Sequence, residues 1–301
     1  LHGLVIGVSG TGRRVHDTEC FRCPDPAVPS LLSSTTAHCH SPLSLSLPRF
    51  FNMQLSPILQ QFDPIALRDM DGVALQTRMD TKYLFGIGRL PQILETLSSE
   101  YRMLEVDGQR GSTYRTLYFD TPERQFYFDH HNGRSFRSKV RMREYASSGA
   151  SFLEVKRRTG RGGTDKRRIP IPAIMEHLTG GQVAFVAEAS GFTRSLVPTL
   201  WNEFFRYTLV HRERAERLTL DTSLSFRDAN GEASLASVCV AELKEGKTGH
   251  GSPFAALMRG LPAPPASFSK YCIGTILLTP GIKHNQFKPI LLHAHRLGLA
   301  A

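Results

Sequence analysis

Basic side chains recur at every second position in one stretch of this sequence, residues 137–143. Four cations alternate there with small or apolar residues: Arg137, Lys139, Arg141 and Arg143 against Ser138, Val140 and Met142. Alternate residues of an extended strand point to the same face, so the cations would share one face of the strand. Arginine binds phosphate through two parallel hydrogen bonds, and lysine adds a point charge. The pattern predicts a strand with a polyanion-binding face.

Two further segments place isolated glutamates among cations. Glu154 shares a predicted strand face with Lys156 and Arg158, and Glu242 shares one with Lys244. A solvated face usually mixes both signs of charge, whereas these faces are mainly cationic. A carboxylate suits a divalent cation that bridges phosphates. Two interpretations stay open: a cation-lined face that binds a metal and phosphates, and an ordinary half-buried sheet whose glutamates pair with neighbouring lysines and arginines.

The elements that must position these residues follow from hydrophobic period and turn signals. Apolar residues at helical spacing predict a helix over 89–102, and shorter helices fit 172–179, 189–203 and 252–260. Segments of period two between glycine, proline and Asn-Gly signals predict strands over 114–122, 135–145, 151–158, 164–171, 205–216, 217–226, 234–246 and 267–278. The predicted fold class is α+β, with a mostly antiparallel, closed β-barrel (tunnel) of about eight strands and flanking helices.

Composition narrows the classes of partner. The 301 residues carry 37 Lys+Arg against 27 Asp+Glu, a formal net charge of +10. This excess favours an anionic partner, namely nucleic acid, a phosphate compound or an anionic lipid surface. The basic strands lack the interleaved aromatic residues of a base-stacking platform, so no nucleic acid is expected. No apolar run reaches about 18 residues, and five scattered cysteines fit a reducing compartment.

A change of composition divides the chain into three predicted regions. Residues 1–52, rich in Ser, Pro, Thr and His, are expected to be a disordered extension, or not part of the native protein. Residues 53–282 form the folded domain, and residues 283–301 form a C-terminal tail. Two strings in the first region are interpreted as chance matches. GVSGTGRR (7–14) lacks the Lys and Ser/Thr of a phosphate-binding loop, and Cys20, Cys23, His38, Cys39 and His40 lack the spacing of a zinc site.

Seven strings resemble, in order, the VTC domain, which is the catalytic module of polyphosphate polymerases within the CYTH-like triphosphate tunnel metalloenzyme superfamily. They are RMDTKYLF (78–85), YRTLYFDTP (114–122), FDHHNGRSFRSKVRMREY (128–145), FLEVKRRTGRGGTDKRR (152–168), RLTLDTSLSF (217–226), VAELKEG (240–246) and FSKYCIG (268–274). The resemblance implies that residues 53–282 form one such tunnel domain.

The resemblance implies a role for each matching residue. The catalytic side chains, which would bind the nucleotide triphosphate and the product chain, are Lys82, Arg141, Arg143, Lys156, Arg212 and Lys270. Further substrate-binding positions would be Lys139, Lys166, Arg168, Arg214 and Arg217. Glu242 would be the metal ligand and Glu154 a second acidic candidate, with Mn²⁺ or Mg²⁺ as the cofactor. His211 stands where the family commonly has tyrosine, and the stretch after it is shortened, so Arg214 is an alternative to Arg212.

The implied activity is that of a metal-dependent polyphosphate polymerase, which transfers the γ-phosphate of ATP onto a growing polyphosphate chain inside a basic tunnel. Two alternatives stay open. One is a tunnel triphosphatase acting on nucleoside triphosphate or inorganic triphosphate, and the other is a non-catalytic module that binds polyphosphate or inositol phosphates. The implied partners are ATP and polyphosphate, with inositol phosphates and a membrane protein as further candidates. The expected location is cytoplasmic, with membrane association only through such a partner.

Overall fold

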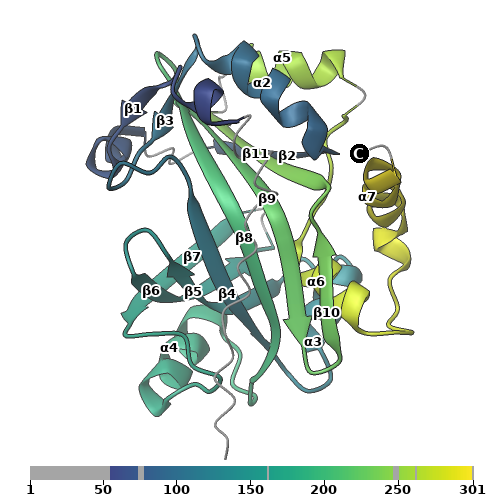
Figure 1. The fold of residues 1–301 in the computed structure, drawn as a ribbon. Helices are drawn as coiled ribbons and strands as arrows, with labels where there is room; N and C mark the ends of the chain where they lie inside the picture. The colour runs from purple at the N-terminus through teal and green to yellow at the C-terminus, as the bar shows by residue number, and fades with distance from the viewer. Residues whose placement is uncertain (1–54, 74–77, 161–162, 247–250, 262, 300–301) are drawn as a thin grey trace, which may run out of the picture. The chain divides into compact units, whose positions relative to one another are not determined.

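The computed structural model describes residues 55–73, 78–160, 163–246, 251–261 and 263–299 (Figure 1). All of them belong to one of the two units into which the chain divides, Ser44–Ala301. The predictions made for residues 1–52, including the phosphate-loop-like string and the Cys/His set, lie outside the described residues.

The described strands form one sheet of eleven strands. Eight of them make up its main path, in the order β2–β11–β9–β8–β4–β5–β6–β7, and each neighbouring pair is antiparallel. Short strands extend this path: β10 pairs with β9, β3 pairs with β8, and β1 runs parallel to β3. The bounds are β1 Asp63–Ile65, β2 Arg78–Gly86, β3 Tyr101–Leu104, β4 Ser112–Asp120, β5 Arg137–Tyr145, β6 Ala150–Arg158, β7 Thr164–Ile171, β8 Val197–His211, β9 Glu216–Asp228, β10 Gly231–Leu235 and β11 Val238–Gly246.

The sheet curls, but its path does not close. Among the described residues no backbone pairing joins β2 to β7, so the predicted closed barrel is not confirmed, whereas the α+β class and the antiparallel sheet are. The curl brings Lys156 of β6 into the electrostatic field of Lys82 of β2, although these strands lie toward opposite ends of the path. Side chains bridge the two halves, since Lys82 donates to the Phe268 carbonyl and Lys139 of β5 to the Ser269 hydroxyl. We call the face that carries these lysines the inner face.

Helices lie on both faces of this sheet. Among the described residues, no helix combines the length and the hydropathy that crossing a membrane requires. The helices are α2 Leu90–Leu97, α3 Gln125–His131, α4 Gly180–Ser190, α5 Pro253–Gly260, α6 Lys270–Leu278 and α7 Lys288–Leu299, with 3₁₀ helices η1 Leu67–Val73, η2 Ile87–Arg89 and η3 Asn285–Phe287.

Three predicted elements differ from the structure. Residues 267–278 are not a strand, because Ser269 caps a helix, α6, by accepting a hydrogen bond from the Cys272 N–H at 3.3 Å; a short apolar run does not distinguish strand from helix. The helix predicted over 189–203 is wrong, since α4 ends before Gly191, whose φ of 70° terminates it, and β8 begins at Val197. Residues 172–179 form bends rather than a helix.

Two hydrophobic clusters cover the outer face. In the first, α2 and α5 pack against β2, β9 and β11, with Leu94 and Phe254 as fully buried members. In the second, α4 packs against β4, β5 and β6 through Val186 and its neighbours. A third cluster lies on the inner face, where α6 packs against Phe204 of β8 and Val240 of β11. The rest of the inner face is left to polar side chains.

Asp120, a fully buried carboxylate at the end of β4, anchors α6 to the sheet. Its Oδ1 accepts hydrogen bonds from the backbone N–H groups of Thr121 and Phe126 at 2.7 and 2.8 Å, and its Oδ2 accepts one from Tyr127 at 3.0 Å. The Tyr271 hydroxyl also donates to Oδ2. Buried carboxylates are tolerated when several donors satisfy them. Because Tyr271 follows Lys270, this network fixes where the first residue of α6 lies.

Gly274 in α6 is predicted to tolerate no side chain. A Cβ at this position would overlap the ring of Phe226 and lie 2.8 Å from Leu200 Cδ2. Gly274→Ala should therefore destabilise the domain by about 1–3 kcal/mol through overpacking. The matched control is Gly181→Ala in α4, where no atom lies within 4 Å and the better helix propensity of alanine should raise the free energy of unfolding. Denaturant unfolding measures both, and equal stability of the two variants would contradict this packing.

Candidate functional site

The inner face gathers charged side chains from α6 and from seven of the eight strands of the main path, all except β4. Strand alternation places them there, because each lies an even number of residues from the others on its own strand. Cations far outnumber carboxylates in this set, which we call the basic face: Lys82 (β2), Lys139, Arg141 and Arg143 (β5), Glu154 and Lys156 (β6), Lys166 and Arg168 (β7), Arg206 (β8), Asp221 (β9), Glu242 and Lys244 (β11) and Lys270 (α6).

On β5, β6 and β7 a buried glutamate holds two cations. Arg141 and Glu154 are direct cross-strand partners, with Arg141 Nη2 2.6 Å and Lys166 Nζ 2.6 Å from the two carboxylate oxygens. Glu154 is 1% exposed. Burial alone would raise the pKa of this carboxyl, but Arg141, Arg143 and Lys166 hold it well below its usual range. Glu154 is therefore a fixed anion that orients Arg141 and Lys166.

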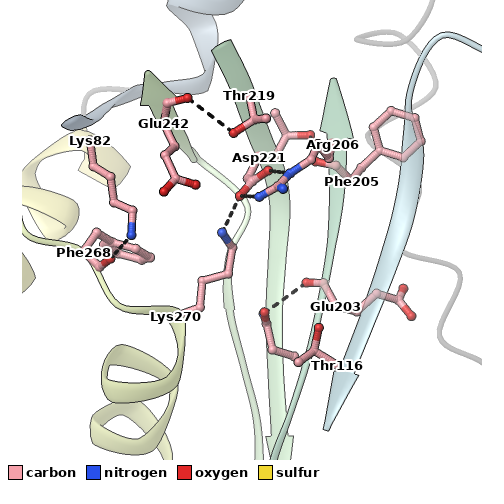
Figure 2. Close-up of polar contacts among 12 residues, drawn as sticks. Lys82, Thr116, Glu203, Phe205, Arg206, Thr219, Asp221, Glu242, Phe268 and Lys270 are labelled. Atoms are coloured by element: carbon pink, nitrogen blue, oxygen red, sulfur yellow. Dashed lines mark hydrogen bonds and ion pairs between the residues drawn. The ribbon is translucent and has the colours of Figure 1, made fainter. Parts of the chain in front are cut away.

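On β8, β9 and α6 a buried aspartate plays the same part. The Arg206 guanidinium donates two hydrogen bonds to Asp221, from Nε to Oδ1 at 2.5 Å and from Nη2 to Oδ2 at 2.8 Å. Lys270 forms an ion pair with Oδ2 of the same carboxylate. The Lys270 ammonium also lies 4.3 Å from the centre of the Phe204 ring. Burial, the largest cause, lowers the pKa of Lys270 to about 8, and Arg206 and Lys82 add to this while Asp221 opposes it. Figure 2 shows Lys82, Glu242, Asp221, Arg206 and Lys270 extending toward one another.

On β2 and β11 the third carboxylate, Glu242, is held less completely. It lies directly opposite Lys82 in the strand register, and its Oε1 is 3.0 Å from Lys244 Nζ, which also contacts Asp80 at 3.0 Å. Lys82 itself donates to the Phe268 carbonyl at 3.1 Å. Burial would raise the pKa of Glu242, but the charges of Lys82 and Lys244 outweigh it and lower the pKa. Glu242 is thus an anion at the middle of the site.

Arg143 and Lys139 are among the cations of the basic face that have no carboxylate within ion-pair distance among the described residues. Arg143 is 6% exposed, and its Nε donates to the Thr116 hydroxyl at 3.1 Å. Lys139 donates to the Ser269 hydroxyl at 3.0 Å. Burial first, and then Lys82 and the other neighbouring cations, lower the pKa of Lys139 to about 7. A desolvated cation without a counter-charge is costly, so this part of the face is prepared for an anion from outside the chain.

The structure brings most of the predicted site residues together, but not Arg212 and Arg214. Arg212 follows the end of β8 and bonds to Asp63 Oδ2 at 2.6 Å and to the Ser99 carbonyl at 2.8 Å, and Arg214 bonds to the Gly251 carbonyl. Arg217 lies opposite Lys244 in the register of β9 and β11. The exposed Arg168 side chain lies over the Phe152 ring at 4.5 Å. The roles predicted for all of these residues remain predictions.

Sequence reasoning missed Arg206 and Asp221. The signal was present, because Arg206 alternates with Tyr207 and Leu209 as Asp221 does with Leu220, which places both on polar strand faces. The sequence analysis assigns this part of the site to the arginines after residue 211 instead, because no glycine or proline marks the end of β8. Only the register of β8 with β9, which has a shift between Glu203 and Phe205, shows that Arg206 meets Asp221.

The two predicted metal ligands, Glu242 and Glu154, differ in how well their surroundings suit a metal ion. Among the described residues no group of three or more His, Cys, Asp or Glu side chains is placed to hold a metal ion. Mg²⁺ in phosphate-transfer sites is often bound by one or two carboxylates together with substrate phosphates, so a single glutamate suffices if phosphates complete the shell. Glu242 fits this role, because its ion pair with Lys244, at 3.0 Å, engages Oε1 and not Oε2. Both oxygens of Glu154 already contact cations, so Glu154 fits poorly.

Comparison with known proteins agrees with the family resemblance. A model of the VTC domain matches residues 77–279, and no curated protein matches the chain. Similar solved structures include a candidate adenylyl cyclase from Hippeastrum with a dominant triphosphatase activity, 15% identical over 69% of this chain and 100% of that chain, with a TM-score of 0.41. A candidate adenylate cyclase from Bacillus halodurans is 14% identical over 64% of this chain and 94% of its own, with a TM-score of 0.43. With TM-scores this low, these likenesses do not decide the activity.

Arg206 and Arg212 can be distinguished by binding of inorganic tripolyphosphate. Arg206→Ala should weaken binding at least about tenfold, because a charge-assisted contact within the basic face is lost. Arg212→Ala should leave the affinity within about twofold, since its guanidinium is engaged with Asp63 on the surface. Isothermal titration calorimetry measures both affinities, and thermal unfolding checks that each variant is folded. A loss with Arg212→Ala alone would contradict the geometry described above.

Proposed function

The chain belongs to the VTC-domain family, and on this premise we propose that it is a metal-dependent polyphosphate polymerase that transfers the γ-phosphate of ATP onto a growing polyphosphate chain. The observation that supports this most strongly is the basic face itself. Arg141, Arg143, Arg206 and Lys270 come from two strands of one curled sheet and from α6, and Arg143 is a buried cation without a carboxylate partner among the described residues. A polyanion supplies the charge that this arrangement lacks.

The proposed step needs no nucleophilic side chain. An oxygen of the terminal phosphate of the acceptor chain attacks the γ-phosphorus of ATP, and the bond from that phosphorus to the β–γ bridging oxygen breaks. ADP leaves with the bonding electrons, and the chain is longer by one phosphate. Phosphoryl transfer depends mainly on positioning and on stabilising charge on the transferred group. Arginines and lysines held by buried carboxylates provide both.

The state of the carboxylates favours a phosphate acceptor over water. A water nucleophile benefits from a general base, whereas a terminal phosphate is largely deprotonated near pH 7. The low pKa values of Glu154 and Asp221, which their cation partners cause, make both poor bases. Lys139 has a pKa of about 7 in the free protein, but a bound polyphosphate would raise that pKa and keep the ammonium protonated.

A metal ion would be held by Glu242 together with phosphate oxygens. When bound, Mn²⁺ or Mg²⁺ would neutralise charge on the transferred and leaving phosphates. Lys82 and Lys244, the neighbours of Glu242, keep its carboxylate ionised and would bind the phosphates on either side of it. Glu154 is proposed to orient Arg141 and Lys166 rather than to bind the metal.

The full chain, incubated with ATP and Mn²⁺, should produce a ladder of polyphosphate on a gel. Arg141→Ala and Glu242→Ala should each lower the rate of chain formation by about a hundredfold or more, because the first removes a cation from the transferred phosphate and the second removes the carboxylate that would hold the metal ion. The matched control is Arg115→Ala on β4, whose guanidinium pairs with Glu203 on the opposite face of the sheet. Its rate should stay near that of the unaltered protein.

Two outcomes of this experiment would contradict the proposal. Orthophosphate and ADP without any polyphosphate, with the same sensitivity to Arg141→Ala and Glu242→Ala, would identify a triphosphatase. Tight binding of polyphosphate without any product would identify a non-catalytic binding module.

A further inference from the structure

Two like-charge pairs stand side by side at one end of the β5–β6 hairpin. Arg137 lies directly opposite Arg158, and Lys139 lies directly opposite Lys156 in the next row of the same face. Like charges at directly opposed positions of an antiparallel pair are destabilising. In the third row the pattern changes, because Arg141 faces Glu154. Cations therefore face cations in the two outermost rows, and a carboxylate faces a cation only in the third row. We call the four cations of these two rows the cation ladder.

The cation ladder makes no ion pair within the described part of the chain. None of its four side chains has a carboxylate within 4.0 Å among the described residues, and the Arg137 guanidinium is held only by the Arg134 carbonyl at 2.9 Å. Beside the outer row the Phe136 ring is 63% exposed and lies over Gly160, since a Cβ added there would be 2.6 Å from the ring. The ladder thus reaches the surface at this end of the sheet.

The length of the cationic run indicates what binds there. From Arg143 to Arg137 the inner face of β5 carries a cation in each of four successive rows. Six residues of strand span about 20 Å at about 3.3 Å per residue. A triphosphate is much shorter than this and cannot contact both ends, whereas a longer chain of phosphates can. The rows at the Arg143 end include the buried, carboxylate-held cations, and those at the Arg137 end include the ladder.

We propose that the outer row of the cation ladder, Arg137 and Arg158, binds the polyphosphate chain outside the reaction centre and thereby sets the length of the product. This inference rests on the proposed function, since it assigns the outer row to the chain rather than to the nucleotide. Each added phosphate moves the chain outward by one unit, and a bound outer segment keeps the chain from leaving between additions.

The test compares Arg137→Gln/Arg158→Gln with a matched control on the other face of the neighbouring strands, Arg157→Gln/Arg167→Gln. Arg167 pairs with Glu188 of α4, and Arg157 alternates with the ladder residues on β6. The full chain is titrated with long-chain polyphosphate and with tripolyphosphate. The ladder variant should bind the long chain about tenfold more weakly than the unaltered protein does, with a clearly smaller loss for tripolyphosphate. Its products from ATP and Mn²⁺ should be shorter, and the control should match the unaltered protein in both assays.

Two results would overturn the inference. An equal loss for the long chain and for tripolyphosphate, or a higher KM for ATP with unchanged product length, would assign the ladder to the nucleotide site. Unchanged binding of both ligands would show that the ladder binds neither. If the unaltered protein makes no polymer, the titrations still decide the ladder, and only the proposed function fails.

Discussion

Repulsion among like charges on one face of a curled sheet is the constraint on which the rest of this structure depends. The basic face holds many lysines and arginines, and four carboxylates, Glu154, Asp221, Glu242 and Asp80, neutralise only part of that charge. The remainder is unfavourable for folding. Two hydrophobic clusters on the outer face supply the burial that offsets it. The fold therefore keeps the charge on the inner face, beside the third hydrophobic cluster at α6, and places the other two clusters on the outer face.

The same constraint explains how the site is held in place. Cations that repel one another would turn outward into water unless something fixed them. Glu154 fixes Arg141 and Lys166, and Asp221 fixes Arg206 and Lys270. Each of these two carboxylates contacts two cations, so it fixes the positions of two positive charges while it neutralises only one. The buried network at Asp120 holds α6, which carries Lys270 to the basic face. Phe268 and Ser269, just before α6, link the two halves of the open sheet. Preorganised charge of this kind is what phosphoryl transfer requires.

Much of this arrangement follows from the sequence, and the exceptions have physical causes. Period two alone placed Arg141, Arg143 and Lys156 on polar faces, because strand alternation is a local property. The helix α6 was read as a strand because a short apolar run is ambiguous until its cap at Ser269 is recognised. Arg206 was missed in favour of Arg212, since strand ends and register depend on partners distant in sequence. The sequence also does not predict that cations contact both carboxylate oxygens of Glu154 but only Oε1 of Glu242. This difference depends on which strands the curl brings close together.

The most direct test of the central claim, that the basic face is a set of cations completed by a polyanion, is the proton uptake that accompanies tripolyphosphate binding. Burial and neighbouring cations lower the pKa of Lys139 to about 7, so this side chain is mostly neutral at pH 8. A bound polyanion favours the charged form and raises the pKa, so binding draws in a proton. Calorimetry at pH 8 in buffers of different ionisation enthalpy should show that the unaltered protein takes up about one proton more per ligand than Lys139→Met does. Equal proton uptake by both proteins, at measurable affinity, would contradict the claim.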